Sequence, residues 1–511
     1  MKPIIQMLVV LSFCISVAAP AQDKRPNIVL IMADDMGFSD IGCFGSEIAT
    51  PNLDRLAANG LRLTQFYNTG RCCPSRASLM TGLYPHQAGV GHMVDNKGMP
   101  GYQGFLNDRC VTIAEVLRQS GYRTLMTGKW HIGNNRPNWP TDRGFERYFG
   151  LVSGGSNYFR LDPNRIMALD DKSISPLPSY YATDAFTDYA VQFLEETRAK
   201  EQPFFLYLAY TAPHWPLHAQ PEDIAKYRGK YKGGWEAMRE KRYQKMIDLG
   251  IIDKTWALSP GGAPSWENAK DKDQWDLRMA VYAAQIDRMD AGIGRVMNKL
   301  KEMGAEENTL VVFFADNGGC AEDIERGKAD AEIGTADSFT SYQKPWAKVR
   351  NTQFRLYKHW NHEGGIASPF VAYWPAKIRK SDISHSAAHI IDLMPTCLEI
   401  AGVSYPRQFN GRDILPVEGK SLLPVLEDKT KEVHDVIYWE HEGNRAVRQG
   451  NWKLVAENEA EWELYELKND RSELNNLATK HPDKVKELSE LYEKWEQRCG
   501  VVRPKVLNKK K

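Results

Sequence analysis

The sequence predicts an α/β fold, with a large mixed, mostly parallel sheet flanked by helices and a smaller C-terminal subdomain of antiparallel strands plus one helix. Apolar segments that end in polar residues alternate with helical patterns from residue 25 to about 425, as in parallel strands joined by crossover helices. After about 425 the strands become short and follow one another directly. The 511 residues suffice for two unequal units. We therefore expect a main domain over 22–425 and a C-terminal α+β subdomain over 426–511.

The first 21 residues have the features of an export signal. Lys2 precedes an apolar run from Ile4 to Val17, which is too short to span a bilayer, and small residues suited to a signal peptidase follow at 19–21. We expect residues 1–21 to be a signal peptide that is removed, leaving a periplasmic or secreted protein that does not bind a membrane.

Charge and cysteine content exclude several classes of function. The 66 basic and 65 acidic residues nearly cancel, so no overall field draws the protein to nucleic acid or to an anionic membrane. A bound anion must therefore be captured by a local group of cations. Seven of the eight cysteines lie outside the signal, too scattered for a disulfide framework or a CxxC zinc site. Because seven is an odd number, at least one cysteine needs an explanation other than pairing in a disulfide.

Two buried strands are predicted to end at pairs of oxygen-bearing side chains. The continuous apolar run NIVLIMA stops at Asp34-Asp35, and the run LVVFFA stops at Asp316-Asn317. Two segments far apart in the sequence are thus both predicted to place oxygen-bearing side chains at the carboxyl end of a buried strand.

Capping signals mark the crossover helices. Thr50 and Pro51 supply an N-cap and a first-turn proline for a short helix that closes at Gly60. Thr112 and Glu115 form a capping box before another helix.

Periodicity predicts the remaining elements. An apolar stripe over 279–300 predicts a helix that lies on the sheet, and strands are expected at 122–126 and 204–209. The polar, Trp/Tyr/Lys-rich stretch 219–276 is either a surface insertion near the mouth of a site or a solvated packing excursion. Short strands VIYWE, RAVRQ, WKLVA and ELYEL precede a polar helix near 482–497.

The segment RCCPSRASLMTG, residues 71–82, combines a nucleophile with an anion clamp. Pro74 suits the first turn of a helix and so places Cys72 at the helix N-terminus, where free backbone N–H groups favour anionic ligands. Arg76 follows one turn later and projects on the same side. A buried thiol and a surface cation are the ordinary explanation of one such pair, but the extended pattern around it favours a functional role.

CxPSR followed by LxTG resembles the signature of type I sulfatases, in which the first cysteine is oxidised after translation to formylglycine. The other family blocks occur in order from NIVLIMADDMG to the C-terminal WKLV and ELYEL, so the resemblance covers almost the entire chain. It is to bacterial arylsulfatase-type enzymes of the alkaline phosphatase superfamily. It implies an alkaline phosphatase-like fold, a sulfuric ester hydrolase, and a formylglycine-generating maturation enzyme that converts Cys72 to 3-oxoalanine.

The resemblance also implies one calcium ion. The family's site maps onto Asp34, Asp35, Asp316 and Asn317, with the modified Cys72 completing it. A lone Asp-Asp or Asp-Asn pair is usually a turn or a helix cap, but two such pairs after buried strands favour a metal. Hard oxygen ligands without a Cys/His cluster fit Ca²⁺ or Mg²⁺ better than zinc.

Three further blocks supply residues that the resemblance places around a sulfate group. In GKWHIG, Lys129 is expected to bridge formylglycine and a sulfate oxygen, and His131 to hold one hydroxyl of the nucleophile. His214 lies in APHWP, and Lys358 precedes the EGG tripeptide, where it would contact sulfate and the leaving oxygen. Together with Arg76 and the metal, these cations would face the charge that grows on that oxygen.

The implied mechanism uses a hydrated aldehyde at residue 72. One hydroxyl, activated by Asp35 or a neighbour and by the metal, attacks sulfur while His214, with Lys358, protonates the departing alcohol. His131 then removes the proton from the second hydroxyl, so that sulfate leaves and the aldehyde returns. An unmodified serine or cysteine lacks that second hydroxyl.

Three other functions compete with this one. Phosphomonoester and phosphodiester hydrolases of the superfamily typically hold two metals and commonly have Asp-His-Gly where this chain has Asp316-Asn317-Gly318. A sulfamidase, which cleaves N–S rather than O–S bonds, shares the core residues. An inactive glycan-binding relative would have lost charged core residues, and none of the expected positions has lost its residue.

We expect the substrate to be a sulfated sugar rather than a simple aryl ester, with a galactose-type unit as the narrower hypothesis, because exported bacterial relatives mostly remove sulfate from glycans. Aromatic faces and forked donors suit carbohydrate rings. Candidate sugar contacts of these types are Trp139, Arg143, Asn157, Tyr158, Trp215 and His359. The family match falls on His214, so we expect His218 to be structural or to lie at the substrate rim.

Overall fold

The computed structural model describes residues 25–198, 202–261, 264–378, 380–427, 432–458 and 460–503. The expected signal peptide over 1–21 lies outside these residues. In the described part, no helix is both long enough and apolar enough to cross a membrane.

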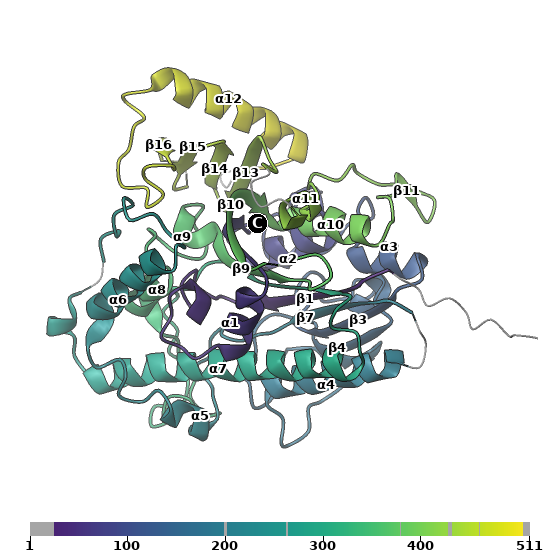
Figure 1. Ribbon diagram of the computed structural model, residues 1–511, viewed down its shortest axis with the longest axis horizontal. Helices are drawn as coiled ribbons and strands as arrows, with labels where there is room; N and C mark the ends of the chain where they lie inside the picture. Colours follow the sequence, from purple (N-terminus) through teal and green to yellow (C-terminus); the bar gives the residue numbers. More distant parts are fainter. Residues whose placement is uncertain are drawn as a thin grey trace, which may run out of the picture.

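A ten-stranded mixed sheet forms the centre of the protein (Figure 1), in the order β10-β2-β9-β8-β1-β7-β3-β4-β5-β6. Its strands are β1 (Asn27–Ala33), β2 (Leu61–Tyr67), β3 (Arg123–Gly128), β4 (Arg147–Leu151), β5 (Met167–Leu169), β6 (Lys172–Ser173), β7 (Phe204–Ala209), β8 (Thr309–Ala315), β9 (Ala367–Tyr373) and β10 (Asp382–His389). Strands β8, β1, β7, β3 and β4 run parallel, and antiparallel pairing begins at β9 on one side and β5 on the other. The predicted mostly parallel sheet is confirmed.

Strand β1 is buried on both faces. Val29 and Ile31 belong to one hydrophobic cluster, whereas Ile28 and Leu30, which point the other way, belong to a second. Two-sided burial requires apolar residues at every position of the strand and explains why the sequence reads as a continuous apolar run rather than an alternating one.

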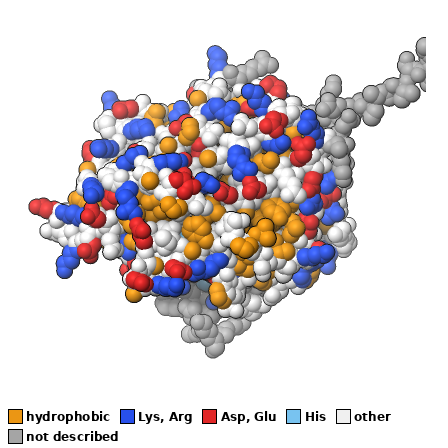
Figure 2. Space-filling model, turned by 90° about the horizontal axis from the view of Figure 1, so that it is seen from below, with side chains coloured by type: hydrophobic (Ala, Val, Ile, Leu, Met, Phe, Trp, Pro, Cys, Tyr) orange, Lys and Arg blue, Asp and Glu red, His pale blue; other side chains and the backbone are white. Residues whose placement is uncertain are grey.

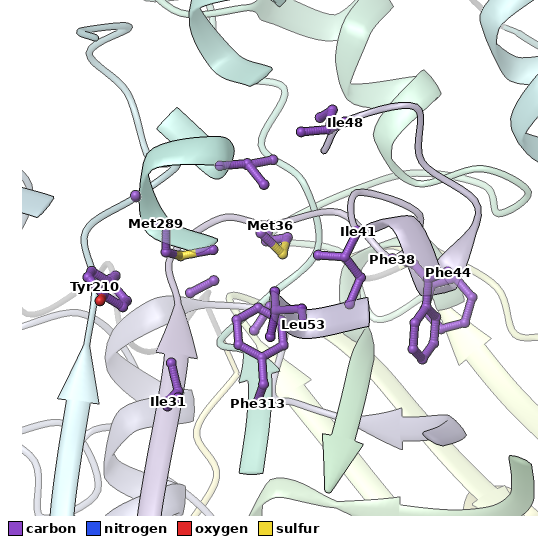
Figure 3. Packing of buried hydrophobic residues seen from close by; sticks show 14 of the residues in the cluster. Ile31, Met36, Phe38, Ile41, Phe44, Ile48, Leu53, Tyr210, Met289 and Phe313 are labelled. Carbon is purple, nitrogen blue, oxygen red and sulfur yellow. The ribbon is translucent and has the colours of Figure 1, made fainter. Parts of the chain in front are cut away.

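Helices cover the two faces of the sheet. The helices of the first face are α1 (Pro51–Ala58), α4 (Ala182–Arg198) and α7 (Lys272–Glu302), and those of the second are α2 (Cys72–Thr81), α3 (Ile113–Gln119) and α10 (Leu393–Ile400). Figure 3 shows Ile31 and Phe313 of the sheet packed close to Leu53 of α1 and Met289 of α7. The long α7 contains the predicted 279–300 stripe and extends it at its N-terminal end.

Local signals in the sequence account for several helix ends. Pro51 is the first residue of α1. At α3, the Glu115 backbone N–H donates to Thr112 Oγ1 at 3.0 Å, and the Thr112 N–H donates to Glu115 Oε2 at 2.7 Å, which is the predicted capping box. Further elements of the main domain are α5 (Pro221–Ala225), α6 (Gly234–Asp248), α8 (Gln343–Arg350), α9 (Glu363–Ile366), α11 (Leu423–Glu427), β11 (Gln408–Phe409) and β12 (Arg412–Asp413).

The C-terminal region forms the predicted antiparallel sheet with one helix. Its elements are β13 (Val436–His441), β14 (Asn444–Gln449), β15 (Trp452–Ala456), β16 (Glu463–Glu466) and α12 (Pro482–Cys499). Leu454 of the sheet and Leu488 and Trp495 of the helix share a small hydrophobic cluster. In Figure 1, α12 lies across the top of these strands, on the opposite side of the molecule from α7.

The polar stretch 219–276 packs against the main domain. Within it, Arg242 of α6 is buried and its Nη1 lies 2.7 Å from Asp40 Oδ1. The ring of Trp235 meets that of Trp346 in α8 with centroids 5.8 Å apart. Of the two predictions for this stretch, the structure agrees with packing against the domain rather than with an insertion at the mouth of a site. The contacts are buried, however, and not solvated as that prediction had them.

The face opposite α12 carries mixed charges. Figure 2 shows basic and acidic side chains interspersed over this face, with a band of hydrophobic side chains between them. The mixture agrees with the formal net charge of +1 and produces no extended field of one sign.

A buried ionic network joins the C-terminal sheet to the main domain. Lys453 Nζ of β15 lies 2.9 Å from Glu363 Oε1 in α9 and 2.8 Å from Glu473 Oε1. Arg471 Nε donates to Glu363 Oε2 at 2.8 Å. All four side chains are buried, so each charge depends on the others for compensation.

We expect Lys453→Met to lower the free energy of unfolding by about 3–5 kcal/mol, because it leaves two carboxylates buried without their shared cation. Lys377→Met is the matched control, since Lys377 is half exposed and its pair with Glu427 spans 3.2 Å; its expected cost is below about 1 kcal/mol. Chemical denaturation of the purified variants measures both. Equal losses would contradict the account of the network.

Candidate active site

Four neighbouring parallel strands, β8, β1, β7 and β3, deliver most of the predicted residues at their carboxyl ends. The residues that follow these strands are Asp316 and Asn317, Asp34 and Asp35, His214, and Lys129. In register, Ala33 at the end of β1 is paired with Ala315 at the end of β8. Because parallel strands end at one edge of a sheet, residues far apart in the sequence converge there.

Helix α2 brings the predicted nucleophile and clamp to the same edge. Cys72 is its first residue, and both Cys72 and Arg76 are buried. Arg76 Nη2 lies 2.8 Å from Asp316 Oδ2, and its Nη1 donates to the Lys129 carbonyl at 2.7 Å. The guanidinium therefore ties the helix to the ends of β8 and β3.

Two buried lysines pair with the two aspartates after β1. Lys129 Nζ lies 2.5 Å from Asp34 Oδ2, and Lys358 Nζ lies 2.8 Å from Asp35 Oδ1. Burial by itself would raise the pKa of Asp34, but the charges on Lys129 and Arg76 hold it below its ordinary value. All of these groups are fully buried or nearly so, and each cation has a carboxylate partner.

Cys72 differs from the other cysteines in its electrostatics. A hydrogen bond from Cys73, together with the charge of Lys129, holds the pKa of the Cys72 thiol well below its usual range despite burial. All seven cysteines of the described part are buried and free. Burial raises the pKa of the remaining six, which are Cys43, Cys73, Cys110, Cys320, Cys397 and Cys499.

His131 stands beside Cys72 as a neutral base. Ligand atoms of Cys72, Cys73 and His131 lie within 4.8 Å of one another. Burial and the adjacent Lys129 lower the pKa of His131 to about 4, so its imidazole is uncharged near neutral pH. The φ angles of His131 and Asp35 are 60° and 63°, which places both residues in the strained left-handed region that often occurs at functional sites.

His214 lies beside Asp35. Its Nε2 lies 3.4 Å from Asp35 Oδ2, and its Nδ1 lies 2.5 Å from the Trp215 carbonyl, which can only accept. Nδ1 therefore carries a proton. The hydroxyl of Tyr158 lies 2.8 Å and 2.9 Å from the carbonyl oxygens of Thr211 and His214, and so fixes this loop.

Two buried oxygens in the site have no hydrogen-bond partner among the described residues. They are Asp34 Oδ1 and Asn317 Oδ1. Burial and the nearby charge of Asp34 also raise the pKa of Asp316 well above its usual value. Crowded carboxylates with unsatisfied oxygens fit a hard divalent cation such as Ca²⁺ or Mg²⁺, which takes six to eight or six oxygen ligands respectively. The donor set after β1 and β8 therefore fits the predicted metal.

The sequence did not predict the contacts of Arg350 that hold the backbone at Asp35. Arg350 donates to the Asp35 carbonyl through Nη2, and its Nε lies 3.1 Å from Asp40 Oδ2. A Cβ at Gly37 would lie 2.4 Å from the Arg350 carbonyl oxygen, which explains the glycine in the ADDMG motif. Arg350 has no neighbouring motif that could have drawn attention to it.

Four of the six candidate sugar contacts are buried and bonded within the protein. Arg143 donates to Glu115 and to two backbone carbonyls, and Tyr158 holds the His214 loop. Trp139 Nε1 donates to the Asn134 carbonyl, and Asn157 Nδ2 to that of Ala336. For these four the sugar-contact prediction is wrong, because their polar atoms are already used in packing.

The other two candidates lie at the edge of the site. Trp215 Nε1 donates to Glu322 Oε2 at 2.8 Å, and Arg71 Nη1 lies 3.0 Å from Glu322 Oε1. His359 follows Lys358 directly and is partly exposed. Arg71 and Glu322 were not predicted, because Glu322 lies in no motif and Arg71, although it directly precedes Cys72, falls outside the CxPSR pattern.

His218 is structural, as one of the two readings of the sequence expected. It is fully buried, its Nε2 lies 2.6 Å from the Ser338 carbonyl, and its Nδ1 accepts from the Tyr158 backbone N–H at 3.3 Å. It therefore fixes the loop that carries Tyr158.

Comparison with known proteins assigns the family. Residues 26–403 match the sulfatase family model, and residues 353–498 match that of the N-sulphoglucosamine sulphohydrolase C-terminal region. An uncharacterized sulfatase of Schizosaccharomyces pombe is 37% identical, over 94% of this chain and 95% of that protein. The arylsulfatase of Klebsiella aerogenes is 36% identical, over 81% and 94%.

A solved structure gives the same answer for the fold. The crystal structure of Ps i-CgsB superposes with a TM-score of 0.70 at 27% identity, covering 92% of each chain, and a second structure of that protein contains k-i-k-neocarrahexaose. The chain therefore belongs to the sulfatase family and is a type I sulfatase, a sulfuric ester hydrolase with an alkaline phosphatase-like fold.

Proposed function

We propose that this protein is an exported sulfatase that hydrolyses O-sulfate esters of carbohydrates, with formylglycine at position 72 and one calcium ion. The observation that carries the proposal is the surroundings of Cys72. Cys72 is the one thiol of the described chain with a lowered pKa, and it is the first residue of a helix. Arg76 and Lys129 interact with it electrostatically, and His131 lies beside it.

Charge balance supports the metal. Arg76, Lys129 and Lys358 are matched by Asp34, Asp35 and Asp316, so the three cations and three carboxylates cancel. A neutral cage has no net attraction for a sulfate ester, whereas a divalent cation held by Asp34, Asp35, Asp316 and Asn317 would leave a charge of +2. When bound, calcium would supply this charge and polarise the sulfate oxygens.

The chain's own groups then divide the proton transfers. Formylglycine hydrate would supply two hydroxyls on one carbon at residue 72. His131, neutral and beside that residue, is the base that takes a proton there. His214 donates its Nδ1 proton to the Trp215 carbonyl and faces the Asp35 carboxylate with Nε2, so a second proton held on Nε2 would be the one given to the leaving alcohol. Lys129, Lys358 and Arg76 orient the sulfate oxygens and stabilise developing negative charge.

We propose a sulfated glycan as substrate, with a galactose-type unit as the narrower hypothesis. Support comes from Ps i-CgsB, which is 27% identical and has been solved with an oligosaccharide. Trp215 and His359, both partly exposed at the edge of the site, are the residues placed to contact a sugar. We further propose a signal peptide at 1–21, a sulfatase domain at 22–425, a subdomain at 426–511, and a maturation enzyme that modifies Cys72.

A desulfation screen tests the function. Protein matured with a formylglycine-generating enzyme is incubated with sulfated mono- and disaccharides, and released sulfate is measured, with Cys72→Ala as the blank. Release from at least one O-sulfated sugar, absent from the blank, is expected. No release from any sulfated sugar by protein that cleaves a simple aryl sulfate would contradict the carbohydrate assignment.

A sulfamidase is the second candidate. The match of residues 353–498 to the N-sulphoglucosamine sulphohydrolase C-terminal region favours it, whereas the 36% identical arylsulfatase favours ester cleavage. Glucosamine carrying only an N-sulfate, offered beside its 6-O-sulfated isomer, separates the two. Sulfate release from the N-sulfated sugar alone would establish the sulfamidase.

Gly154 tests the positioning of His131. A Cβ at Gly154 would lie 2.8 Å from His131 Nε2, so Gly154→Ala is expected to displace the imidazole and lower kcat about 10- to 100-fold. The control is Gly233→Ala, because Gly233 has a φ of −73° and no heavy atom within 4 Å of an added Cβ. Steady-state kinetics and thermal melting of both variants are compared; equal kcat values would contradict the assigned position.

A further inference from the structure

A second group of potential metal ligands lies beside the active site. It comprises His359, which follows Lys358, and His441 and Glu442 at the end of β13. One ligand atom from each of the three lies within 4.8 Å of the others. His441 and Glu442 have no role in the proposed sulfatase chemistry, and His359 enters it only as one of the two proposed sugar contacts.

The distances suit a small tetrahedral cation. His359 Nδ1 lies 3.2 Å from Glu442 Oε2, and His441 Nε2 lies 3.8 Å from Glu442 Oε1. Two atoms bound to one tetrahedral zinc at about 2.0–2.1 Å are about 3.4 Å apart. The observed separations lie on either side of this value, so small side-chain adjustments would bring the three groups onto one ion.

His441 is unsatisfied within the protein. Its side chain is fully buried, and neither Nδ1 nor Nε2 has a hydrogen-bond partner among the residues that the structure describes. A buried polar group without a partner is costly and rare.

The three side chains come from two connected segments, the β13–β14 turn and the loop that contains Lys358. Glu442 and Gly443 form the turn between β13 and β14, with φ angles of 51° and 90°. Asn444 Nδ2, at the start of β14, donates to the His359 carbonyl at 3.2 Å and so joins the hairpin to the Lys358 loop. His92 Nε2 lies 2.7 Å from Glu442 Oε1 and orients that carboxylate, as outer groups do around metal ligands.

We propose that His359, His441 and Glu442 bind a zinc ion, which is distinct from the proposed calcium ion and takes no part in the proposed proton transfers at residue 72. Imidazole nitrogens with one carboxylate suit zinc, whereas calcium prefers oxygen ligands. Three protein ligands leave one position of the tetrahedron for water or another ligand. His359 and Glu442 are 29% and 33% exposed, which gives an ion access from solvent.

Zinc binding is tested in the full-length Cys72→Ala protein, because Cys72, Cys73 and His131 form a competing thiolate group. The protein is stripped with chelator, reloaded with calcium and titrated with zinc in equilibrium dialysis with elemental analysis. One zinc per chain is expected. Glu442→Gln and His359→Asn are expected to weaken binding by about 100-fold or more, and the orienting change His92→Asn by about 10- to 100-fold.

His481→Asn provides the control, since His481 is exposed, directly precedes the C-terminal helix α12 and lies outside the cluster. The zinc affinity of this variant should equal that of the parent. Absorption spectra of the protein loaded with cobalt in place of zinc report the type of ligand. We expect the d–d bands of tetrahedral cobalt and no sulfur-to-cobalt charge-transfer band. Thermal melting shows whether each variant is folded. Retention of no zinc, or zinc affinity equal in all variants, would overturn the proposal. A raised KM for sulfated sugars, measured with Glu442→Gln made in the active protein that retains formylglycine, would also overturn it if the parent binds no zinc, because the cluster would then contact substrate directly.

Discussion

Cys72→Ala is expected to lower kcat by about 10⁴-fold or more, the scale on which removal of a nucleophile acts. Affinity for sulfate should change little, because Arg76, Lys129 and Lys358 remain in place. The free energy of unfolding should fall by only about 1 kcal/mol, since a small buried thiol is replaced by a smaller apolar group. Steady-state kinetics, sulfate binding by calorimetry and chemical denaturation measure the three quantities separately.

Two further variants sharpen this prediction. Cys73→Ala removes the neighbouring buried thiol, whose pKa is raised by burial, and should retain activity within about tenfold of the parent because it carries none of the chemistry. Cys72→Ser should release the alcohol once and then stop, since serine has no second hydroxyl. Equal losses in Cys72→Ala and Cys73→Ala would contradict the assignment of the nucleophile.

Removal of calcium is expected to lower kcat/KM by about 10³-fold, which corresponds to several kcal/mol of lost charge stabilisation. The physical reason is the cancellation of three buried cations by three carboxylates, which leaves the cage without net positive charge. Chelation should also lower the melting temperature, because Asp34 and Asp316 are then crowded without a shared cation. Calcium added back should restore both activity and melting temperature.

Asp316→Asn is expected to weaken calcium binding, so that activity requires a higher calcium concentration. Asp290→Asn is the matched control: Asp290 is also buried, but it caps α1 through the Asn52 and Leu53 backbone N–H groups. That control should melt at a lower temperature with an unchanged calcium requirement. If chelated protein kept full activity, or if both variants had the same calcium requirement, the metal assignment would be wrong.

Parts of the fold were predictable because local chemistry determines them. The burial of β1 on both faces requires a continuous apolar run, and its end at Asp34-Asp35 marks the edge of the sheet. The run ending at Asp316-Asn317 repeats that signal, and the adjacency of β1 and β8 brings the four oxygen-bearing side chains together. The capping box of α3 is likewise determined by two residues close in sequence, Thr112 and Glu115.

Other features depend on tertiary packing and could not be predicted from short patterns. Tyr158 and Arg143 have the chemistry of sugar contacts, but each is enclosed by segments distant in sequence that use its polar atoms. The zinc cluster joins His359 to His441 only because the β13–β14 turn folds over the Lys358 loop. No local spacing relates these residues.

The central claim is that residue 72 is formylglycine within the cage of Arg76, Lys129 and Lys358. Trypsin cleaves after Arg71 and Arg76, so the segment from Cys72 to Arg76 is released as one short peptide, and mass spectrometry of that peptide from active protein tests the claim most directly. The account predicts a species in which one sulfur is replaced by oxygen and two hydrogens are lost, in a fraction that rises with kcat across preparations. Fully active protein that yields only the intact thiol peptide would contradict it.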